Sequence, residues 1–319
     1  EFFKFTRNLS KKKNLSQGPG GNTSIKIENS LYIKSSGTWF KDSLKKNSFT
    51  KIDLNSIKKN IKNEKKWKFA RSKSYPSIET LMHALIHQKY VVHLHSISVL
   101  SYAVLKEGKE ILETKLKNFK WVWIKYKKPG LNLALEIKKN FSKDINIYIL
   151  QNHGIIYAAN TLKKINLLLK KIEKKLKRNI TFTLKKNIQK KNLSNRLFLK
   201  PKDKIIQNFA WNKKFFKIIQ NKSLYPDHVV FLYNKILALN NYSENILDKK
   251  IDKKVIVLKN YGVFVGENIS FAEYEMLLCL AMLLRILPLN DNLSFLNKIQ
   301  EKELINWDKE ILRQNINKG

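Results

Sequence analysis

Two kinds of apolar spacing alternate along the first 180 residues. Short segments rich in Ile, Val, Tyr and Phe, bounded by Gly, Pro, Asn or Ser, predict β-strands. Longer segments with apolar residues three or four positions apart predict helices. The expected strands are a hairpin at 25–34 with its turn at 28–30, and single strands at 90–94, 119–124, 145–150 and 155–158. The expected helices are 1–16 (a helix or an arm), 77–88, 98–106, 131–140 and 161–177.

Polar residues mark helix starts and a change in the pattern. Ser77 and Thr161 are expected to cap the helices that follow them, because a side-chain oxygen at that position accepts from a free backbone N–H. The Lys- and Asn-rich segment 41–66 is expected to hold a solvated strand and a helix. The Lys-rich segment 178–203 has no clear period, and we place a domain boundary there, between residues 1–185 and 186–319.

The second part of the chain has strand and helix patterns of its own. Strands are expected at 226–232, 254–258 and 263–266. A helix is expected from a Ser270 cap to about residue 287. The region after the boundary is therefore expected to be a C-terminal α/β extension.

One segment of the second part resembles a segment of the first. Residues 149–156 read Ile-Leu-Gln-Asn-His-Gly-Ile-Ile, and residues 257–264 read Val-Leu-Lys-Asn-Tyr-Gly-Val-Phe. Both predict strand, Asn-x-Gly turn, strand and capped helix. Either the unit was duplicated and one copy lost a polar role, or the same solution arose twice. Because His153 is replaced by Tyr261 in the second segment, the difference favours a chemical role for His153 over a role in the turn.

The large positive net charge does not by itself indicate a nucleic acid or membrane partner. The chain has 63 Lys and Arg against 25 Asp and Glu, a net charge of +38, which is typical of proteins that bind nucleic acids or anionic membranes. Only six of the basic residues are Arg, the side chain preferred for bidentate phosphate and base contacts. The abundance of Lys, Asn and Ile indicates AT-rich codons. We therefore interpret most of the charge as a solvated surface and expect no specific nucleic acid partner, with polyanion binding as the alternative.

Other totals exclude several classes of protein. A hydrophobic content of 43% with 17 Phe excludes a disordered chain. The single cysteine, Cys279, excludes an internal disulfide framework and a Cys-rich zinc module. No apolar run approaches the length of a membrane-spanning helix, and the first residues carry no signal-peptide pattern. We expect a cytoplasmic protein with no membrane partner.

Three histidines form a candidate metal site. His93 and His95 lie two positions apart on an expected strand, so their rings project from the same face. Two such rings repel each other when protonated, but they suit one divalent cation. His153, followed by the flexible Gly154, is the obvious third ligand. Three histidines with an open fourth position are typical of catalytic zinc. The alternative is that His93 and His95 are ordinary half-buried strand residues.

One carboxylate stands close to this pattern. Glu79 opens the helix before the His93 strand and is a candidate acid or base, or else an acid favoured by the helix dipole. His83 and His87 follow on the same helix face. Their spacing is not the His-Glu-x-x-His metal pattern, so we expect them to face the core or to support the metal ligands.

The glycine-rich segment 18–24 is a candidate phosphate loop. It reads Gly-Pro-Gly-Gly-Asn-Thr-Ser, which is neither a Walker A loop nor a dinucleotide fingerprint. Its N–H groups, Asn22 and the hydroxyls of Thr23 and Ser24 suit a phosphate. A plain turn is the alternative. A second loop of small residues follows at 35–38.

Six motifs in order carry a family resemblance. They are Gly-Gly-Asn-Thr-Ser at 20–24, Ile-Lys-Ser-Ser-Gly-Thr-Trp at 33–39, Pro-Ser-Ile-Glu at 76–79, His-Leu-His at 93–95, Pro-Gly at 129–130 and Asn-His-Gly at 152–154. This set resembles the class II aldolase/adducin family, which includes fuculose- and rhamnulose-phosphate aldolases. With its tail at 225–231 and 306–310, the chain looks closest to the aldolase part of bacterial rhamnose-utilisation proteins. The strong similarity covers about residues 15–180.

The resemblance implies a fold and a set of site residues. The fold would be a three-layer α/β/α arrangement around a largely antiparallel sheet, and members are commonly tetramers with sites at subunit interfaces. His93, His95 and His153 would bind Zn²⁺, or another divalent metal, and Glu79 would be the catalytic acid/base. The anionic sugar-phosphate substrate would contact a set of small and polar residues: Gly21, Asn22, Thr23, Lys34, Ser36, Gly37 and Ser77.

The resemblance also implies a reaction. A zinc-dependent aldolase would cleave a ketose phosphate through a metal-stabilised enediolate, with Glu79 moving the proton. Alternatives on the same scaffold are an ulose-phosphate epimerase, a decarboxylase, a dehydratase and a non-catalytic adducin-like binding module. One departure is Ile78, where small members often carry a second Ser. It weakens the inference of a phosphate. We also find no counterpart of the tyrosine that some members use as a proton donor.

Overall fold

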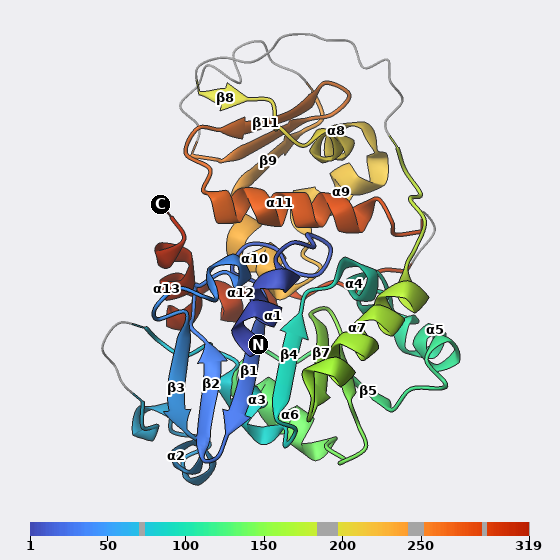
Figure 1. Cartoon of the computed structure of the whole chain (residues 1–319). Coiled ribbons are helices and arrows are strands. Elements are labelled where there is room, and N and C mark those ends of the chain that lie inside the picture. Colours follow the sequence, from blue (N-terminus) through green and yellow to red (C-terminus); the bar gives the residue numbers. More distant parts are fainter. Residues whose placement is uncertain (70–73, 184–196, 242–251, 289–291, 319) are drawn as a thin grey trace.

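Two β-sheets and the helices around them make up the chain. The computed structural model describes residues 1–69, 74–183, 197–241, 252–288 and 292–318. The larger sheet belongs to the N-terminal region and the smaller one to the C-terminal region, and helix α11 (Phe271–Leu284) crosses between them (Figure 1). Within these ranges, no helix is both long and apolar enough to span a bilayer.

The larger sheet has seven strands in the order β3-β2-β1-β4-β7-β6-β5. All neighbours are antiparallel except β5 and β6, which are parallel. The sheet is therefore largely antiparallel, as the family resemblance implied. Its strands are β1 (Asn22–Ile27), β2 (Ser30–Lys34), β3 (Phe49–Asp53), β4 (Tyr90–Leu94), β5 (Trp121–Ile124), β6 (Ile147–Leu150) and β7 (Gly154–Ala159).

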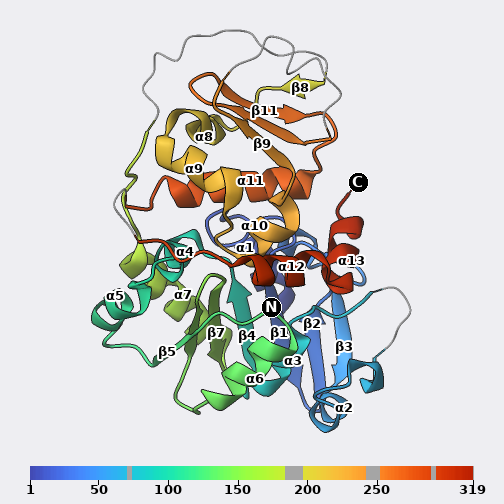
Figure 2. The same ribbon diagram turned by 180° about the vertical axis from the view of Figure 1, so that it is seen from behind.

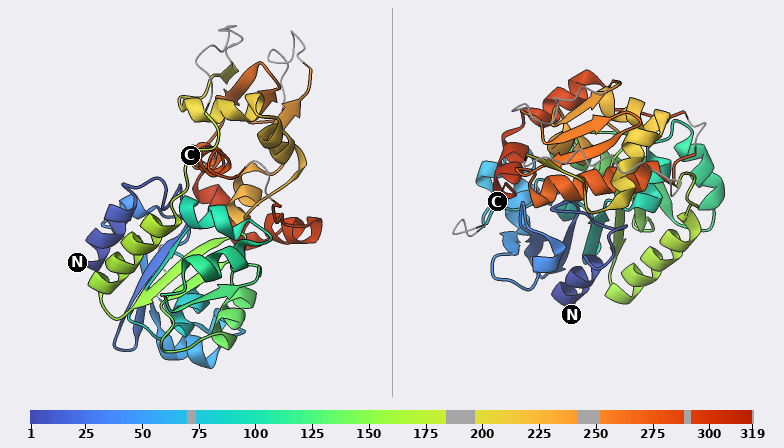
Figure 3. Two further views of the ribbon diagram at one scale, coloured as in Figure 1. Left: turned by 90° about the vertical axis from the view of Figure 1, so that its right-hand side faces the viewer. Right: turned by 90° about the horizontal axis from the view of Figure 1, so that it is seen from above.

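Helices cover both faces of this sheet (Figure 3). On β4, Val92 packs into one core cluster and its neighbour Val91 into another, because successive side chains point to opposite faces. The Val92 side is covered by α1 (Phe2–Leu9), α4 (Ile97–Ala103), α5 (Gly108–Lys115) and α7 (Leu162–Leu176). The Val91 side is covered by α2 (Leu54–Lys59), α3 (Thr80–Leu85) and α6 (Leu131–Lys139). The predicted three-layer α/β/α fold is confirmed.

Most predicted elements of this region are present, with shifted ends. Thr161 caps α7 as predicted, its side chain accepting from the Lys164 N–H at 3.2 Å. The predicted cap at Ser77 is wrong. Helix α3 begins at Thr80 with Glu79 as its N-cap residue, and Ser77 instead closes the turn before it, since its carbonyl accepts from Thr80. Helix α5 was not predicted from the sequence.

The smaller sheet has four strands in the order β8-β11-β10-β9. They are β8 (Phe198–Leu199), β9 (Ile236–Leu239), β10 (Val255–Leu258) and β11 (Gly262–Gly266). The helices of this region are α8 (Asn208–Trp211), α9 (Lys213–Asn221), α10 (Pro226–Leu232), α11, α12 (Lys298–Ile305) and α13 (Asp308–Ile316). Short 3-10 turns complete the described chain at Phe40–Asp42, Glu64–Lys66 and Lys204–Gln207. The predicted C-terminal α/β region is therefore present.

The segment predicted as a strand at 226–232 is a helix, α10. All seven of its residues are buried, so its apolar run has no period that separates a strand from a helix. The position of Pro226 carries the missing information, because proline at the first helical position loses no hydrogen bond. Asp227 follows it in the first turn, where a carboxylate is favoured by the helix dipole.

The two similar segments identified in the sequence fold alike. Each forms an antiparallel hairpin followed by a capped helix: β6, β7 and α7 in the first, β10, β11 and α11 in the second. The likeness extends to four strands, because β4-β7-β6-β5 and β8-β11-β10-β9 have the same order and directions. Asn152 and Asn260 adopt positive φ angles of 53° and 61° at the two turns.

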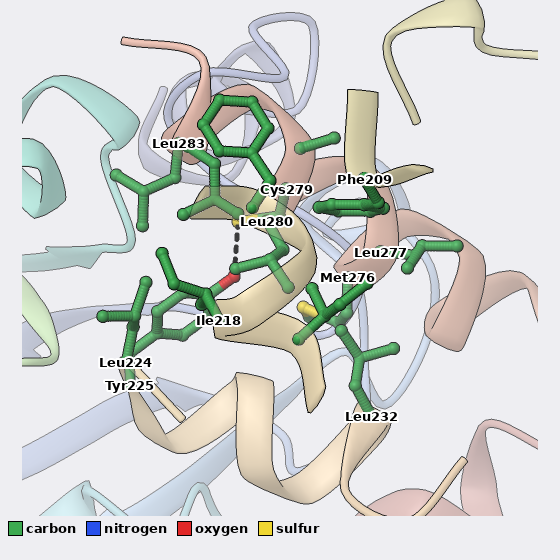
Figure 4. Packing of buried hydrophobic residues seen from close by; sticks show 14 of the residues in the cluster. Phe209, Ile218, Leu224, Tyr225, Leu232, Met276, Leu277, Cys279, Leu280 and Leu283 are labelled. Carbon is green, nitrogen blue, oxygen red and sulfur yellow. Dashed lines mark hydrogen bonds between the residues drawn. The ribbon is translucent and has the colours of Figure 1, made fainter. Parts of the chain in front are cut away.

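The N- and C-terminal regions share one core. Helix α11 is capped by Ser270 and Glu273 as a capping box, and from Met276 onward its residues are apolar. Its residues pack with α9, α10 and Phe209 of α8 (Figure 4), and Ile97 and Leu100 of α4 join the same cluster. Figure 2 shows α10 and α12 between the two sheets. The division at residue 185 stays a prediction, because 184–196 lie outside the described residues.

Candidate metal and substrate site

The three histidines meet where strand β4 ends beside the β6–β7 turn. Leu94 of β4 pairs with Ile155 of β7, which sets the turn residue His153 next to His95. Gly154 makes this approach possible. A Cβ there would lie 2.4 Å from the Leu94 carbonyl oxygen and 3.3 Å from a carbon of each ring of His93 and His95. Any larger residue would push the rings apart.

The imidazoles present their Nε2 atoms to a shared point. His93 Nε2 lies 3.1 Å from His95 Nε2, and one ligand atom from each of the three rings lies within 4.8 Å of the others. The opposite nitrogens of two rings have partners. His93 Nδ1 lies 3.1 Å from the Ile155 carbonyl oxygen, and His95 Nδ1 lies 2.9 Å from Asp227 Oδ2. A proton on Nδ1 leaves Nε2 free to bind a metal.

Glu79 completes this cluster. Its Oε2 lies 3.4 Å from His93 Nε2, and its Oε1 lies 3.5 Å from His153 Nε2. Asn22 donates to Oε2 at 2.7 Å, whereas the buried Oε1 has no hydrogen-bond partner among the described residues. Glu79 makes no capping bond to α3. The structure therefore directs this carboxylate to the histidines and not to its own helix.

The pKa values of His93, His153 and Glu79 favour the protonation states that bind a cation. Burial lowers the pKa of His93 to about 4 and that of His153 to about 3. Burial alone would raise the pKa of Glu79, but His93, His153 and the Asn22 hydrogen bond lower it to about 2. At neutral pH His93 and His153 are thus neutral, and Glu79 is an ionised carboxylate. Together with the unpartnered Glu79 Oε1, this donor set fits a divalent metal.

His83 and His87 occupy different surroundings, although one helix face was predicted for both. His83 is buried, lies 2.7 Å from Ser24 Oγ through Nδ1, and bonds Asn22 Oδ1 through Nε2. It thus holds Asn22, which in turn holds Glu79. His87 stacks on Phe141, with ring centroids 4.4 Å apart, away from the cluster.

A small cavity beside Glu79 collects most of the predicted substrate residues. Gly21, Asn22, Lys34, Ser36, Gly37 and Ser77 line it together with His95 and His153. Gly21 has a φ of +70°, and a Cβ on it would lie 2.8 Å from the His93 carbonyl oxygen. Thr23 lies outside the cavity, because β1 turns it to the opposite face, where its hydroxyl bonds Thr6 at 2.9 Å.

The C-terminal region contributes cavity residues that the sequence reasoning missed. Asp227 of α10 and Glu310 and Arg313 of α13 line the same space. Arg313 pairs with Asp227, and its Nε lies 2.6 Å from Glu310 Oε2. Burial alone would raise the pKa of Asp227, but Arg313 and His95 hold it well below its usual range. The rarity of Arg in this Lys-rich chain was the signal that could have singled out Arg313.

The loop that contains Gly20 packs closely against the contact between His95 and Asp227. A Cβ on Gly20 would lie 2.8 Å from Asp227 Oδ2 and 2.9 Å from His95 Nδ1. The first glycine loop therefore packs against the contact between the metal-binding cluster and α10, and a side chain at this position would separate them.

The chain belongs to the class II aldolase and adducin family. Residues 1–179 match the family described as "Class II Aldolase and Adducin N-terminal domain". A protein of Bacillus subtilis (strain 168) named uncharacterized oxidoreductase YuxG is 26% identical over 164 residues. The similar part covers 44% of this chain and 24% of that protein, so the chain spans only about a quarter of that relative's length.

Solved structures resemble about half of the chain. The N-terminal class II aldolase domain of a conserved protein from Thermoplasma acidophilum is 26% identical, covering 55% of this chain and 89% of that one with a TM-score of 0.49. A sugar-phosphate aldolase from Thermotoga maritima is 16% identical, covering 55% of this chain and 90% of that one with a TM-score of 0.45.

Proposed function

We propose that this chain is a divalent-metal-dependent enzyme that cleaves a carbon–carbon bond of a sugar phosphate. One observation carries the proposal: the Nε2 atoms of three buried histidines and the carboxylate of Glu79 converge on one point. Family membership supports it, since class II aldolases give the family its name. Neither an adducin-like binding role nor a surface charge requires this buried cluster.

In this proposal His93, His95 and His153 hold the metal, with zinc as the expected ion. The bound cation would supply Lewis-acid stabilisation of the negative charge that develops on the sugar oxygens. Glu79 accepts and returns the proton, because its Oε1 is unpartnered and Asn22 fixes its other oxygen. The two small-residue loops orient the substrate's phosphate end through Gly21, Asn22, Ser36 and Gly37, and Ser77 contributes from the segment before Glu79.

Metal analysis and a product screen test the proposal. Purified protein should hold about one divalent ion per chain, and a His93→Ala/His95→Ala double variant should hold none. His87→Ala is the matched control, because it removes an imidazole outside the cluster. Ketose phosphates should release dihydroxyacetone phosphate or a small aldehyde. Release of an epimer, CO₂ or water in place of these products would assign the epimerase, decarboxylase or dehydratase alternative.

The absence of any divalent ion in the purified wild-type protein would refute all of these reactions together. The tetrameric assembly, the cytoplasmic location and the rhamnose-type substrate stay predictions. Light scattering of the purified chain measures the first of them directly.

A further inference from the structure

Two buried cations face the cavity from opposite ends of the chain. Of the Lys and Arg residues that the structure describes, only Lys34 and Arg313 are buried, with 3% and 8% of their surface exposed. Lys34 ends β2 of the N-terminal sheet, and Arg313 lies on α13. Burying a cation is unfavourable unless it is paired, so the enclosure of two cations in one cavity calls for a specific reason.

Arg313 is held in place with donors to spare. Its Nη2 donates to Asp227 Oδ1, and its Nε faces Glu310 Oε2. A guanidinium carries five N–H groups in a planar fork that matches the oxygens of phosphate. Because only two of its nitrogens face these carboxylates, N–H groups remain for a ligand. The two carboxylates therefore orient the side chain without exhausting it.

Lys34 lacks a carboxylate partner of its own. Its Nζ donates to the backbone carbonyls of Thr38 at 2.5 Å and Pro19 at 3.4 Å. Burial, followed by the charge of Arg313, lowers the pKa of Lys34 to about 7. An anion between these two cations would favour the charged form of Lys34. Burial raises the pKa of Glu310 to about 7, so this group takes up a proton more readily than an ordinary carboxylate when an anion approaches.

We propose that Arg313 and Lys34 together bind the phosphate of the substrate, so that the C-terminal helix α13 supplies substrate specificity from within the same chain. The inference rests on the proposed function, which assigns a phosphate to this cavity without assigning Arg313. It also accounts for Ile78, which lines the cavity without offering a hydroxyl. The charged donors of Lys34 and Arg313 would replace the hydroxyl that a serine at position 78 would offer.

The size of the cavity supplies a competing role for Arg313. The cavity has a volume of about 30 Å³, which is room for a few water molecules at most. A sugar phosphate therefore needs more space, which a movement of α13 or of its side chains would provide. If the ion pairs of Arg313 served only to keep α13 in place over the cavity, their removal would make it easier for a ligand to enter the cavity. The two roles thus predict opposite effects of the same substitution.

Binding of inorganic phosphate to the metal-loaded full-length chain, measured by calorimetry without turnover, separates the two roles. Arg313→Gln and Lys34→Met should each weaken phosphate binding about 10- to 100-fold, since each removes a charge-assisted hydrogen bond. Arg313→Lys keeps the charge but loses the fork, so its loss should be smaller. Arg7→Gln, which removes a charge from an exposed position on α1, should bind like the wild type.

Tighter phosphate binding by Arg313→Gln would overturn the proposal and show that Arg313 serves to keep the cavity closed. Unchanged binding, or a wild-type protein that binds no phosphate, would also overturn it. If Arg313→Gln fails to fold because Glu310 is left unpaired, the Glu310→Gln/Arg313→Gln double variant removes that carboxylate and decides the same question. None of these outcomes touches the metal content or the product screen, so the proposed function is judged separately.

Discussion

The two hairpins that end in Asn-x-Gly turns share a backbone but not a chemistry. Each lies in the same four-strand arrangement, and each places an Asn at positive φ. In the first hairpin, His153 is 4% exposed and faces two other histidines. In the second, Tyr261 is 39% exposed. The turn therefore requires the Asn and the Gly, whereas the residue between them is free to carry chemistry.

The strand beside each hairpin explains why only one turn became a site. Strand β4 pairs with β7 over five residues and carries His93, with His95 just beyond its end. Strand β8 is only two residues long, Phe198–Leu199, and offers no ligand to the second turn. A metal site needs donors from both the turn and its neighbour, and the second copy lacks both.

The largest effect is expected when the first turn is given the residue of the second. His153→Tyr removes one of the three metal ligands. Substituting a residue that only hydrogen-bonds to a ligand lowers metal affinity about 10- to 100-fold, so the loss of a ligand should lower it further. Metal content after dialysis measures this. The reciprocal Tyr261→His should gain no metal. A His153→Tyr protein with full metal content would break the comparison.

A large effect on turnover is expected at Glu79, whose carboxylate lies 3.5 Å from the Nε2 atom of His153 in the first turn. Glu79→Gln keeps the shape of the side chain but loses the proton acceptor, and turnover should fall about 10²- to 10⁴-fold. Metal content should be largely retained, because the three histidines remain. Unchanged turnover in a metal-loaded variant would remove Glu79 from the chemistry.

The pH dependence of stability should also distinguish the two turns. In the metal-free protein, burial lowers the pKa of His153 to about 3 and that of His93 to about 4. The unfolded chain binds these protons near pH 6.5, so stability is lost as pH falls from about 6.5 toward 4. His153→Tyr should reduce the slope by about 1.4 kcal/mol per pH unit there. Urea unfolding between pH 4 and 6.5 measures it, and Tyr261→His should leave the slope unchanged.

The smallest expected difference concerns the two turn asparagines. The Asn152 side chain donates to the carbonyls of Leu224 at 2.9 Å and Ser294 at 2.8 Å. Asn152→Ala should cost about 1–3 kcal/mol more than Asn260→Ala, because two backbone carbonyls also lose their donor. Asn260→Ala should cost about 1–2 kcal/mol for its positive φ alone. Equal losses in urea unfolding would show that the contacts of Asn152 contribute nothing.

The sequence predicted the parts of this molecule whose signals are local. Strand β4 alternates between the two cores, so its limits and the shared face of His93 and His95 followed from a period of two residues. The Thr161 and Ser270 caps followed from their own side chains. Helix α10 was mistaken for a strand because all its residues are buried, and burial on every side erases the period.

The remaining site residues had no local signal. Asp227 reaches His95 only because the first turn of α10 lies beside the residue that follows β4, and Arg313 reaches Asp227 only because α13 lies beside α10. Such contacts depend on the packing of distant helices. For Thr23 the local signal was misleading. Its motif predicted a contact with the substrate, but side chains alternate along β1 and the Thr23 hydroxyl points toward Thr6.

The order of the site residues along the sequence has a consequence for synthesis. His93, His95 and His153 leave the ribosome well before α10 and α13, and N-terminal regions generally begin to fold first. The imidazole cluster is thus assembled from residues made early, while Asp227 and Arg313 join it later. A nascent chain can therefore hold the histidine cluster before the cavity is closed, and a chain cut short before α13 would retain the histidines without the guanidinium that faces them.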